Sequence, residues 1–239
     1  MASEFSTIEG AARSLHLQVA REVAKSILSG ALAQHSIIPS EMELCEQFAV
    51  SRTALREAIK HLSSKGLLES RPKIGTRVRA REHWNMLDPQ LLSWMSGLGM
   101  QQQAMDEFIA LRQAIEPQAA ALAAKNATSQ QRSALTEAFL QMSAVAKKQD
   151  WSEWVEADLR FHRLIYLATG NCFFIPFANV LQVMYVHYFK YASQDGHTCM
   201  PEHTAIYQSI MAGDAEQARQ ANLALLALGP QQLAKGAVA

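Results

Sequence analysis

The chain has 239 residues, 49% of them hydrophobic, which is enough for one large or two small domains with packed cores. No stretch reaches the ~18 apolar residues of a membrane-spanning helix, and the N-terminus lacks the basic start and apolar core of a signal peptide. We therefore expect a cytoplasmic protein with no membrane segment. The 22 basic and 22 acidic side chains give a formal net charge of zero.

These charges are spread unevenly along the chain. Residues 1–81 hold 12 Lys/Arg against 8 Asp/Glu, whereas residues 82–239 hold 10 against 14. Within residues 50–81 the count is 9 basic to 2 acidic. A basic N-terminal third predicts that this part of the chain meets a polyanion, while the acidic remainder has another task.

Three amphipathic helices are predicted in the N-terminal third. Apolar residues recur at helical spacing from Leu15 up to Gly30. A second helix begins after Ser40, and a third begins after Ser51, because serine is a favoured N-cap. The third helix ends at Gly66, as glycine commonly follows a helix C-terminus.

A basic hairpin is predicted after these helices. Two short strands, 67–68 and 76–78, flank a turn that contains Pro72 and Gly75. Its basic residues are Arg71, Lys73, Arg77 and Arg79. Helix, helix, short turn, helix and basic hairpin together predict a winged helix-turn-helix, whose third helix enters the major groove and whose hairpin reaches the backbone or minor groove.

The motifs of this region carry a family resemblance. From residue 39 to 78 the chain reads P-S-E, L, V-S-R, L-R-E-A, L, G-L and G-T-x-V in order, and it resembles the DNA-binding domain of the GntR superfamily of bacterial regulators. The resemblance implies operator DNA as a partner, contacted by Ser51, Arg52, Thr53 and Arg56, with Gly75 in a wing to which we add the basic tip residue Lys73. Two positions depart from the pattern. Met42 stands where many relatives have an arginine that reaches DNA, and Gln34-His35 replaces the usual P-G.

The rest of the chain is predicted to be helical. We divide the chain into a DNA-binding domain (1–81), a linker with a short helix (82–102) and an all-α domain (103–239). Residues 84–94 of the linker read W-N-x-L-D-x-x-x-L-x-W, which resembles a stretch of regulators of sugar-acid catabolism (galactonate-type operon repressors). Helices are predicted at about 103–124, 128–148, 151–168, 174–192, 201–212 and 214–228. The expected fold class is mainly α: an N-terminal winged helix-turn-helix and a C-terminal antiparallel helical bundle, in whose core ligand sites commonly lie.

One pair in this bundle has the spacing of metal ligands. Asp158 and His162, from DLRFH, lie four residues apart on one face of the helix predicted at 151–168. By spacing alone, the pair suits a shared metal ion, a salt bridge or a hydrogen-bonded polar cluster. The residues themselves leave these three alternatives open.

A second resemblance bears on this choice. The segments LRQAIEPQAAALAA, EADLRFHRLIYLATGN and EHTAIYQSIMAGDAEQA are similar to the FCD ligand-binding domain of the FadR subfamily. The resemblance implies a divalent ion (Zn²⁺, Ni²⁺ or Mn²⁺) held by Asp158, His162 and His203, but the usual fourth ligand position is Leu225. Three protein ligands leave coordination positions for an effector such as a hydroxy acid. Arg112 matches an effector-facing arginine, and its alternative role is a salt bridge to Glu116.

These features predict a ligand-responsive transcription regulator rather than an enzyme. We expect a homodimer that represses a sugar-acid or related carboxylate operon and is released by its small-acid effector. One alternative is a metal-dependent, hydrolase-like domain fused to a DNA-targeting module, although no general base such as the glutamate of H-E-x-x-H is evident. Another is an architectural DNA-binding protein without a ligand.

Overall fold

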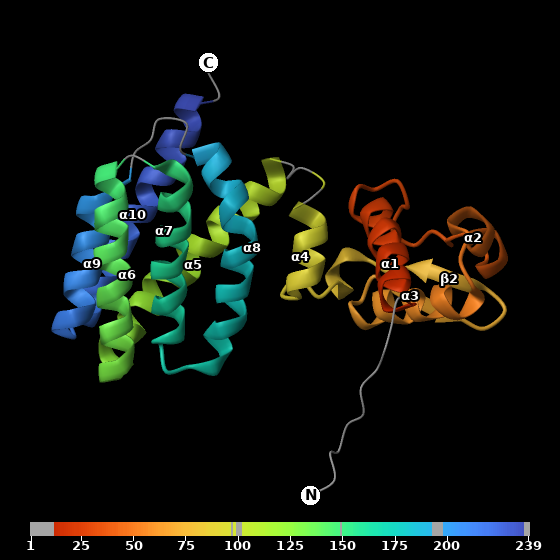
Figure 1. Cartoon of the computed structure of the whole chain (residues 1–239), viewed down its shortest axis with the longest axis horizontal. Coiled ribbons are helices and arrows are strands. Elements are labelled where there is room, and N and C mark those ends of the chain that lie inside the picture. Colours follow the sequence, from red (N-terminus) through yellow and green to blue (C-terminus); the bar gives the residue numbers. More distant parts are fainter. Residues whose placement is uncertain (1–11, 97, 99–101, 149, 193–197, 237–239) are drawn as a thin grey trace, which may run out of the picture. The chain divides into compact units, whose positions relative to one another are not determined.

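The computed structural model describes residues 12–96, 98, 102–148, 150–192 and 198–236 (Figure 1). The chain divides into two compact units, Met1–Leu98 and Gly99–Ala239, and each is described by itself. Residues 82–98 of the predicted linker belong to the first unit. None of the described helices combines the length and apolar character needed to cross a bilayer.

The first unit is a winged helix-turn-helix, as predicted. Its elements are α1 (Ala12–Leu28), α2 (Glu41–Phe48), α3 (Arg52–Ser64), β1 (Leu68–Arg71), β2 (Gly75–Val78), η1 (Arg81–His83) and α4 (Pro89–Ser96). The two strands pair antiparallel, with Leu68 opposite Val78 and Arg71 opposite Gly75. The hairpin is therefore the wing, and the apolar faces of α1 and α3 form the core of the unit.

Side-chain caps determine where α2 and α3 begin. Ser40 and Glu43 form a reciprocal capping box, in which the Ser40 backbone N–H donates to Glu43 at 2.8 Å and the Glu43 N–H donates to Ser40 Oγ at 3.3 Å. Ser51 Oγ accepts from the backbone N–H of Ala54 at 3.2 Å and caps α3. Both caps confirm the predicted helix starts.

The turn before α2 is built around the residues that replace P-G. His35 takes the position of the glycine in a left-handed conformation, with φ of 67°. Its backbone N–H donates to the Val78 carbonyl at 2.9 Å, and the Gln34 side chain accepts from the Arg81 N–H at 2.9 Å. These hydrogen bonds hold a conformation that non-glycine residues rarely adopt.

Helix α4 packs on the same core. Lys65 Nζ donates to both carboxylate oxygens of Asp88, at 2.8 and 2.7 Å, and lies 5.6 Å from the centre of the Trp94 ring. Asp88 also accepts from the Leu91 N–H at 2.8 Å, so it starts α4 while it pairs with the end of α3. These contacts hold α4 against the C-terminal end of α3.

Replacing Gly66 by alanine is expected to lower the free energy of unfolding of the first unit by about 2–3 kcal/mol. The residue has φ of 80°, and an added Cβ would lie 1.9 Å from the His83 carbonyl oxygen. Gly30→Ala is the matched control, because Gly30 has φ of 82° and no atom within 4 Å of its Cβ position. Urea denaturation measures both, and equal losses would show that the close approach of His83 contributes nothing.

The second unit is an all-α bundle, as predicted. Its elements are α5 (Gln102–Asn126), α6 (Ser129–Lys148), α7 (Trp151–Leu167), η2 (Cys172–Phe174), α8 (Ile175–Ala192), α9 (Met200–Ala212) and α10 (Ala215–Gly236). The ends agree with prediction to within two residues, except that α10 continues to Gly236. It therefore runs past the proline at position 230. Helices α6, α7 and α8 lie side by side in Figure 1.

One arginine joins three helix ends in this bundle. Arg132, near the start of α6, donates to the Ala124 carbonyl at 2.8 Å and the Ala127 carbonyl at 3.2 Å, both at the end of α5. It also donates to the carbonyls of Ile210 and Met211 at the end of α9. Carbonyls at the end of a helix lack the N–H donors of a following turn, so Arg132 supplies donors there and fixes α9 against its neighbours.

Candidate functional site

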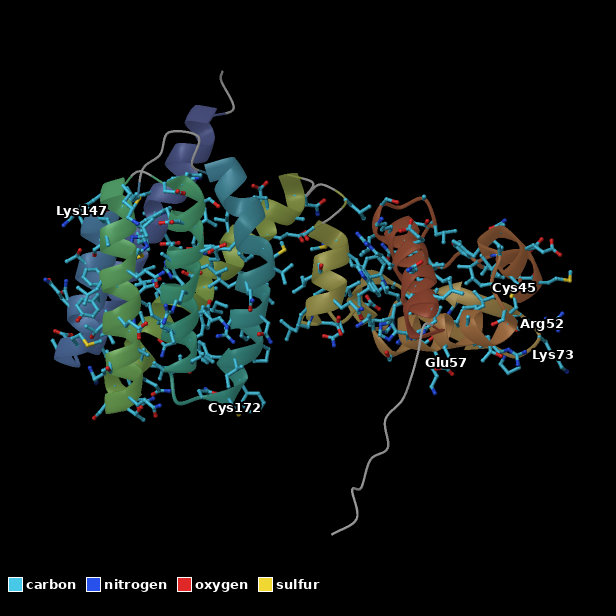
Figure 2. All side chains as sticks on the ribbon, viewed as in Figure 1. Cys45, Arg52, Glu57, Lys73, Lys147 and Cys172 are labelled. Carbon is cyan, nitrogen blue, oxygen red and sulfur yellow. The ribbon has the colours of Figure 1, made fainter. Side chains whose placement is uncertain are left out.

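The predicted DNA-contacting residues of α3 are all exposed. Ser51, Arg52, Thr53 and Arg56 lie in the first two turns of the helix or at its N-cap. Figure 2 shows Arg52 and Lys73 at the same end of the unit, whereas Glu57 lies apart from them. The N-terminal end of a recognition helix is the part that meets base edges in the major groove.

The wing carries fewer available cations than its sequence suggests. Glu69 accepts from Arg77 at 2.8 Å and lies 3.3 Å from Arg71, and the hydrogen bond from Arg77 holds the pKa of Glu69 below its ordinary value. Lys73 lies at the exposed tip with φ of 64°, next to Gly75 with φ of 112°. The tip lysine is therefore better placed for a phosphate than the two paired arginines.

Two neighbours of α3 change the predicted DNA face. Met42 is 60% exposed, and its thioether offers no hydrogen-bond donor to DNA. Arg56 pairs with Glu41 of α2, with Nε 3.0 Å from one carboxylate oxygen and 3.3 Å from the other. No pattern in the sequence indicates this pair, because the two residues are 15 positions apart and only the turn between α2 and α3 brings them together.

In the second unit, the structure brings Asp158, His162 and His203 together. Asp158 and His162 come from α7 and His203 comes from α9, and each is at most 3% exposed. One possible ligand atom from each residue lies within 4.8 Å of the others. His203 Nε2 is 2.7 Å from Asp158 Oδ1, and the Nε2 atoms of the two histidines are 3.3 Å apart.

The outer nitrogens of both histidines face acceptors. His203 Nδ1 lies 2.8 Å from the Cys199 carbonyl oxygen, and His162 Nδ1 lies 3.5 Å from a carboxylate oxygen of Glu116. Both acceptors favour a proton on Nδ1, so we assign the lone pair of each neutral ring to Nε2. Histidines that bind metals have this arrangement, with the second ring N–H donated to a carboxylate or carbonyl.

The charges of the cluster also favour a cation. Burial opposes ionisation of Asp158, but the attraction of His203 and His162 outweighs it and lowers the pKa of Asp158 to about 2. Burial lowers the pKa of His162. Burial also opposes the charge of His203, but the charge and hydrogen bond of Asp158, together with the hydrogen bond to the Cys199 carbonyl, outweigh it and raise the pKa of His203. Within the described residues, Asp158 Oδ1 has no well-aligned hydrogen-bond donor, although His203 is close. An ionised carboxylate and two converging lone pairs fit a divalent ion, and a proton on His203 is the alternative.

Arg112 lies in a buried ion pair. Its Nε donates to Glu116 at 2.6 Å, and its Nη2 donates to Glu116 at 3.2 Å and to the Tyr185 hydroxyl at 3.3 Å. Arg112 is 4% and Glu116 is 2% exposed. The salt bridge considered as its alternative role is therefore present, and Glu116 links it to His162.

The usual fourth ligand position holds no ligand atom. Leu225 is 9% exposed and its side chain is a hydrocarbon. One turn earlier in α10, Asn222 is 1% exposed, and its Oδ1 has no hydrogen-bond partner among the described residues. A buried amide oxygen without a hydrogen-bond partner is unusual in proteins. Asn222 is therefore a buried polar group of α10 one turn before Leu225.

Comparison with known proteins places both units in families. Residues 15–78 match the bacterial regulatory proteins of the gntR family, and residues 107–228 match the FCD domain. The HTH-type transcriptional regulator YieP of Escherichia coli is 38% identical over 216 residues, which cover 90% of this chain and 94% of YieP. The galactonate operon transcriptional repressor of the same organism is 29% identical over 215 residues, covering 88% of this chain and 93% of the repressor.

A solved structure shows the same fold. The Lar protein, described as controlling the agr system of Listeria monocytogenes, superposes with a TM-score of 0.56 at 18% identity and covers 96% of this chain and 99% of its own. The names of the two sequence relatives describe regulators, so they give no support to the hydrolase-like alternative. The helix-turn-helix match implies binding to operator DNA, and the FCD match implies a small-molecule effector. The chain is a transcription regulator of the bacterial GntR family that carries an FCD domain.

Proposed function

We propose that this regulator represses a catabolic operon for a sugar acid or related carboxylate and leaves its operator when that acid binds the FCD domain. The buried cluster of Asp158, His162 and His203 carries the proposal. Two imidazoles and one carboxylate suit Zn²⁺, Ni²⁺ or Mn²⁺. Such an ion, when bound, offers open positions to a carboxylate and a neighbouring hydroxyl. The similarity to a galactonate operon repressor supports a sugar acid as the ligand class.

Arg112 is proposed as a second contact for the acid. A guanidinium has five N–H donors, so the pair with Glu116 and a contact with an effector are compatible. Repression by a homodimer is part of the proposal, because two copies place their recognition helices on the two half-sites of a near-palindromic operator. The acid weakens DNA binding only if it prefers the conformation that does not fit the operator.

The proposal is tested with DNA selected by the full-length protein from a random duplex pool. Fluorescence anisotropy then measures its affinity with D-galactonate, D-gluconate or L-lactate, each with and without Zn²⁺, Ni²⁺ or Mn²⁺. We expect one acid to weaken binding by roughly 5–150-fold, the usual range of such coupling. Failure to select any sequence, or an affinity that no acid changes, would overturn the proposal.

Replacing Arg52 by alanine is expected to weaken binding to the selected duplex by about 10–100-fold, because a bidentate contact to guanine contributes ~1–3 kcal/mol. The loss on a scrambled duplex is expected to be smaller, since a base contact adds little there. Arg160→Ala is the control, because Arg160 is an exposed arginine of the other unit. Equal losses on both duplexes would assign Arg52 to the phosphate backbone instead.

A further inference from the structure

Glu41 places a negative charge beside an arginine of the recognition helix. The pair with Arg56 lies on the protein surface, with 68% of the Arg56 side chain and 42% of the Glu41 side chain exposed. Exposed ion pairs contribute little to folding stability, because water and salt screen them. A carboxylate near DNA also opposes binding, since the backbone of DNA is a polyanion. Neither stability nor affinity for DNA thus explains why Glu41 pairs with Arg56.

The geometry of the pair indicates what Glu41 does. Both carboxylate oxygens face a single guanidinium nitrogen, Nε, at 3.0 and 3.3 Å. Within the described residues, these are the hydrogen bonds of the Arg56 side chain. The Nη1–Nη2 edge, opposite Nε, therefore stays available as a fork of two parallel donors. Such a fork matches O6 and N7 of guanine.

Glu41 is itself held in place. It is the first residue of α2, directly after the N-cap Ser40, whose capping box with Glu43 fixes the start of this helix. An acid in the first turn also interacts favourably with the helix dipole. Glu41 is thus a fixed support for Arg56, whose long side chain otherwise samples many rotamers in solution.

We propose that Glu41 is a positioning residue, which orients Arg56 toward one base pair and increases sequence discrimination while it lowers affinity for DNA in general. The inference rests on the proposed base contact of Arg56. It assigns to the two helices of the motif a joint role: α3 supplies the donor, and α2 aims it.

The test uses Glu41→Gln and a matched control, Glu57→Gln, in the full-length protein. Glu57 is an exposed acid of α3 that lies apart from Arg52 and Lys73 in Figure 2, so its change removes the same charge without touching the pair. We measure affinity for the selected duplex and for a scrambled duplex. Glu41→Gln is expected to lower the ratio of the two affinities by about 5–10-fold, whereas Glu57→Gln leaves the ratio unchanged. Thermal unfolding of both variants confirms that they fold.

The Arg56→Ala background separates the possible outcomes. If Glu41 acts through Arg56, Glu41→Gln has no effect on the ratio in this background. An unchanged ratio for Glu41→Gln alone, or an effect that persists without Arg56, would overturn the inference. If Arg56→Ala itself leaves the ratio unchanged, Arg56 makes no base contact and the inference is wrong. The selection of an operator and its release by an acid are measured separately and do not depend on this result.

Discussion

Alanine in place of Arg112 is expected to lower the free energy of unfolding of the FCD domain by about 3–5 kcal/mol, the usual loss when one partner of a buried ion pair is removed. Glu116, at 2% exposure, would lose its guanidinium partner and keep His162 Nδ1 at 3.5 Å as a neighbour in the described structure. Removing Arg112 is therefore expected to affect the stability of the bundle as well as any contact with an effector. Urea denaturation, followed by far-UV circular dichroism, measures the loss of stability.

The matched control removes both charges. Arg112→Met combined with Glu116→Gln is expected to recover most of the loss, because no unpaired charge remains buried. If Arg112→Ala is as stable as the parent protein, the ion pair with Glu116 does not stabilise the fold. The double variant also keeps a folded protein in which effector affinity can be measured without Arg112, and intact affinity there would limit Arg112 to its ion pair.

Alanine in place of His203 is expected to weaken divalent-metal binding by about 10²–10³-fold. Structural zinc sites gain roughly 10–16 kcal/mol from about four ligands, which is ~3–4 kcal/mol for each. Since ~1.4 kcal/mol corresponds to a factor of ten, the loss of one ligand gives this range. Competition titration against a chromophoric chelator, on protein without an affinity tag, measures Zn²⁺, Ni²⁺ and Mn²⁺ in turn.

Leu225→His supplies the opposite variant. It restores an imidazole at the usual fourth ligand position, so metal affinity is expected to rise rather than fall. Affinity in the parent protein should decrease as the pH falls, because protons compete for the histidines. The competition begins above pH 6.5 at His203, whose pKa the charge of Asp158 raises. If the parent protein takes up no divalent ion at any pH, the three residues are a hydrogen-bonded cluster.

Much of the fold followed from local patterns in the chain. Ser40 and Ser51 were predicted as N-caps and serve as N-caps, because capping depends on a side chain and the backbone three residues away. The helical periodicity of the second unit gave ends within two residues for every helix except α10. The pairing of Asp158 with His162 on one face of α7 follows from the same periodicity, since residues four apart lie one turn apart.

The contacts of the functional residues depend on residues that are distant in the sequence or lie on other helices. Glu41 approaches Arg56 across 15 residues, and His203 reaches Asp158 from another helix. The family resemblance groups His203 with Asp158 and His162, whereas no pattern in the sequence indicates Glu41. Glu116 was recognised as a partner for Arg112, but its second contact, with His162, depends on how α5 packs against α7.

The sequence alone is sufficient to predict the helices, their caps, the wing and the family, because each depends on neighbours within a few positions or on short motifs. Packing determines which charged groups meet. It pairs Arg56 with Glu41, buries Arg112 with Glu116 and directs the two histidine Nε2 atoms toward Asp158. Contacts of this kind depend on the relative position of separate helices. Spacing along one helix cannot specify that position, because it results from the burial of all their apolar faces together.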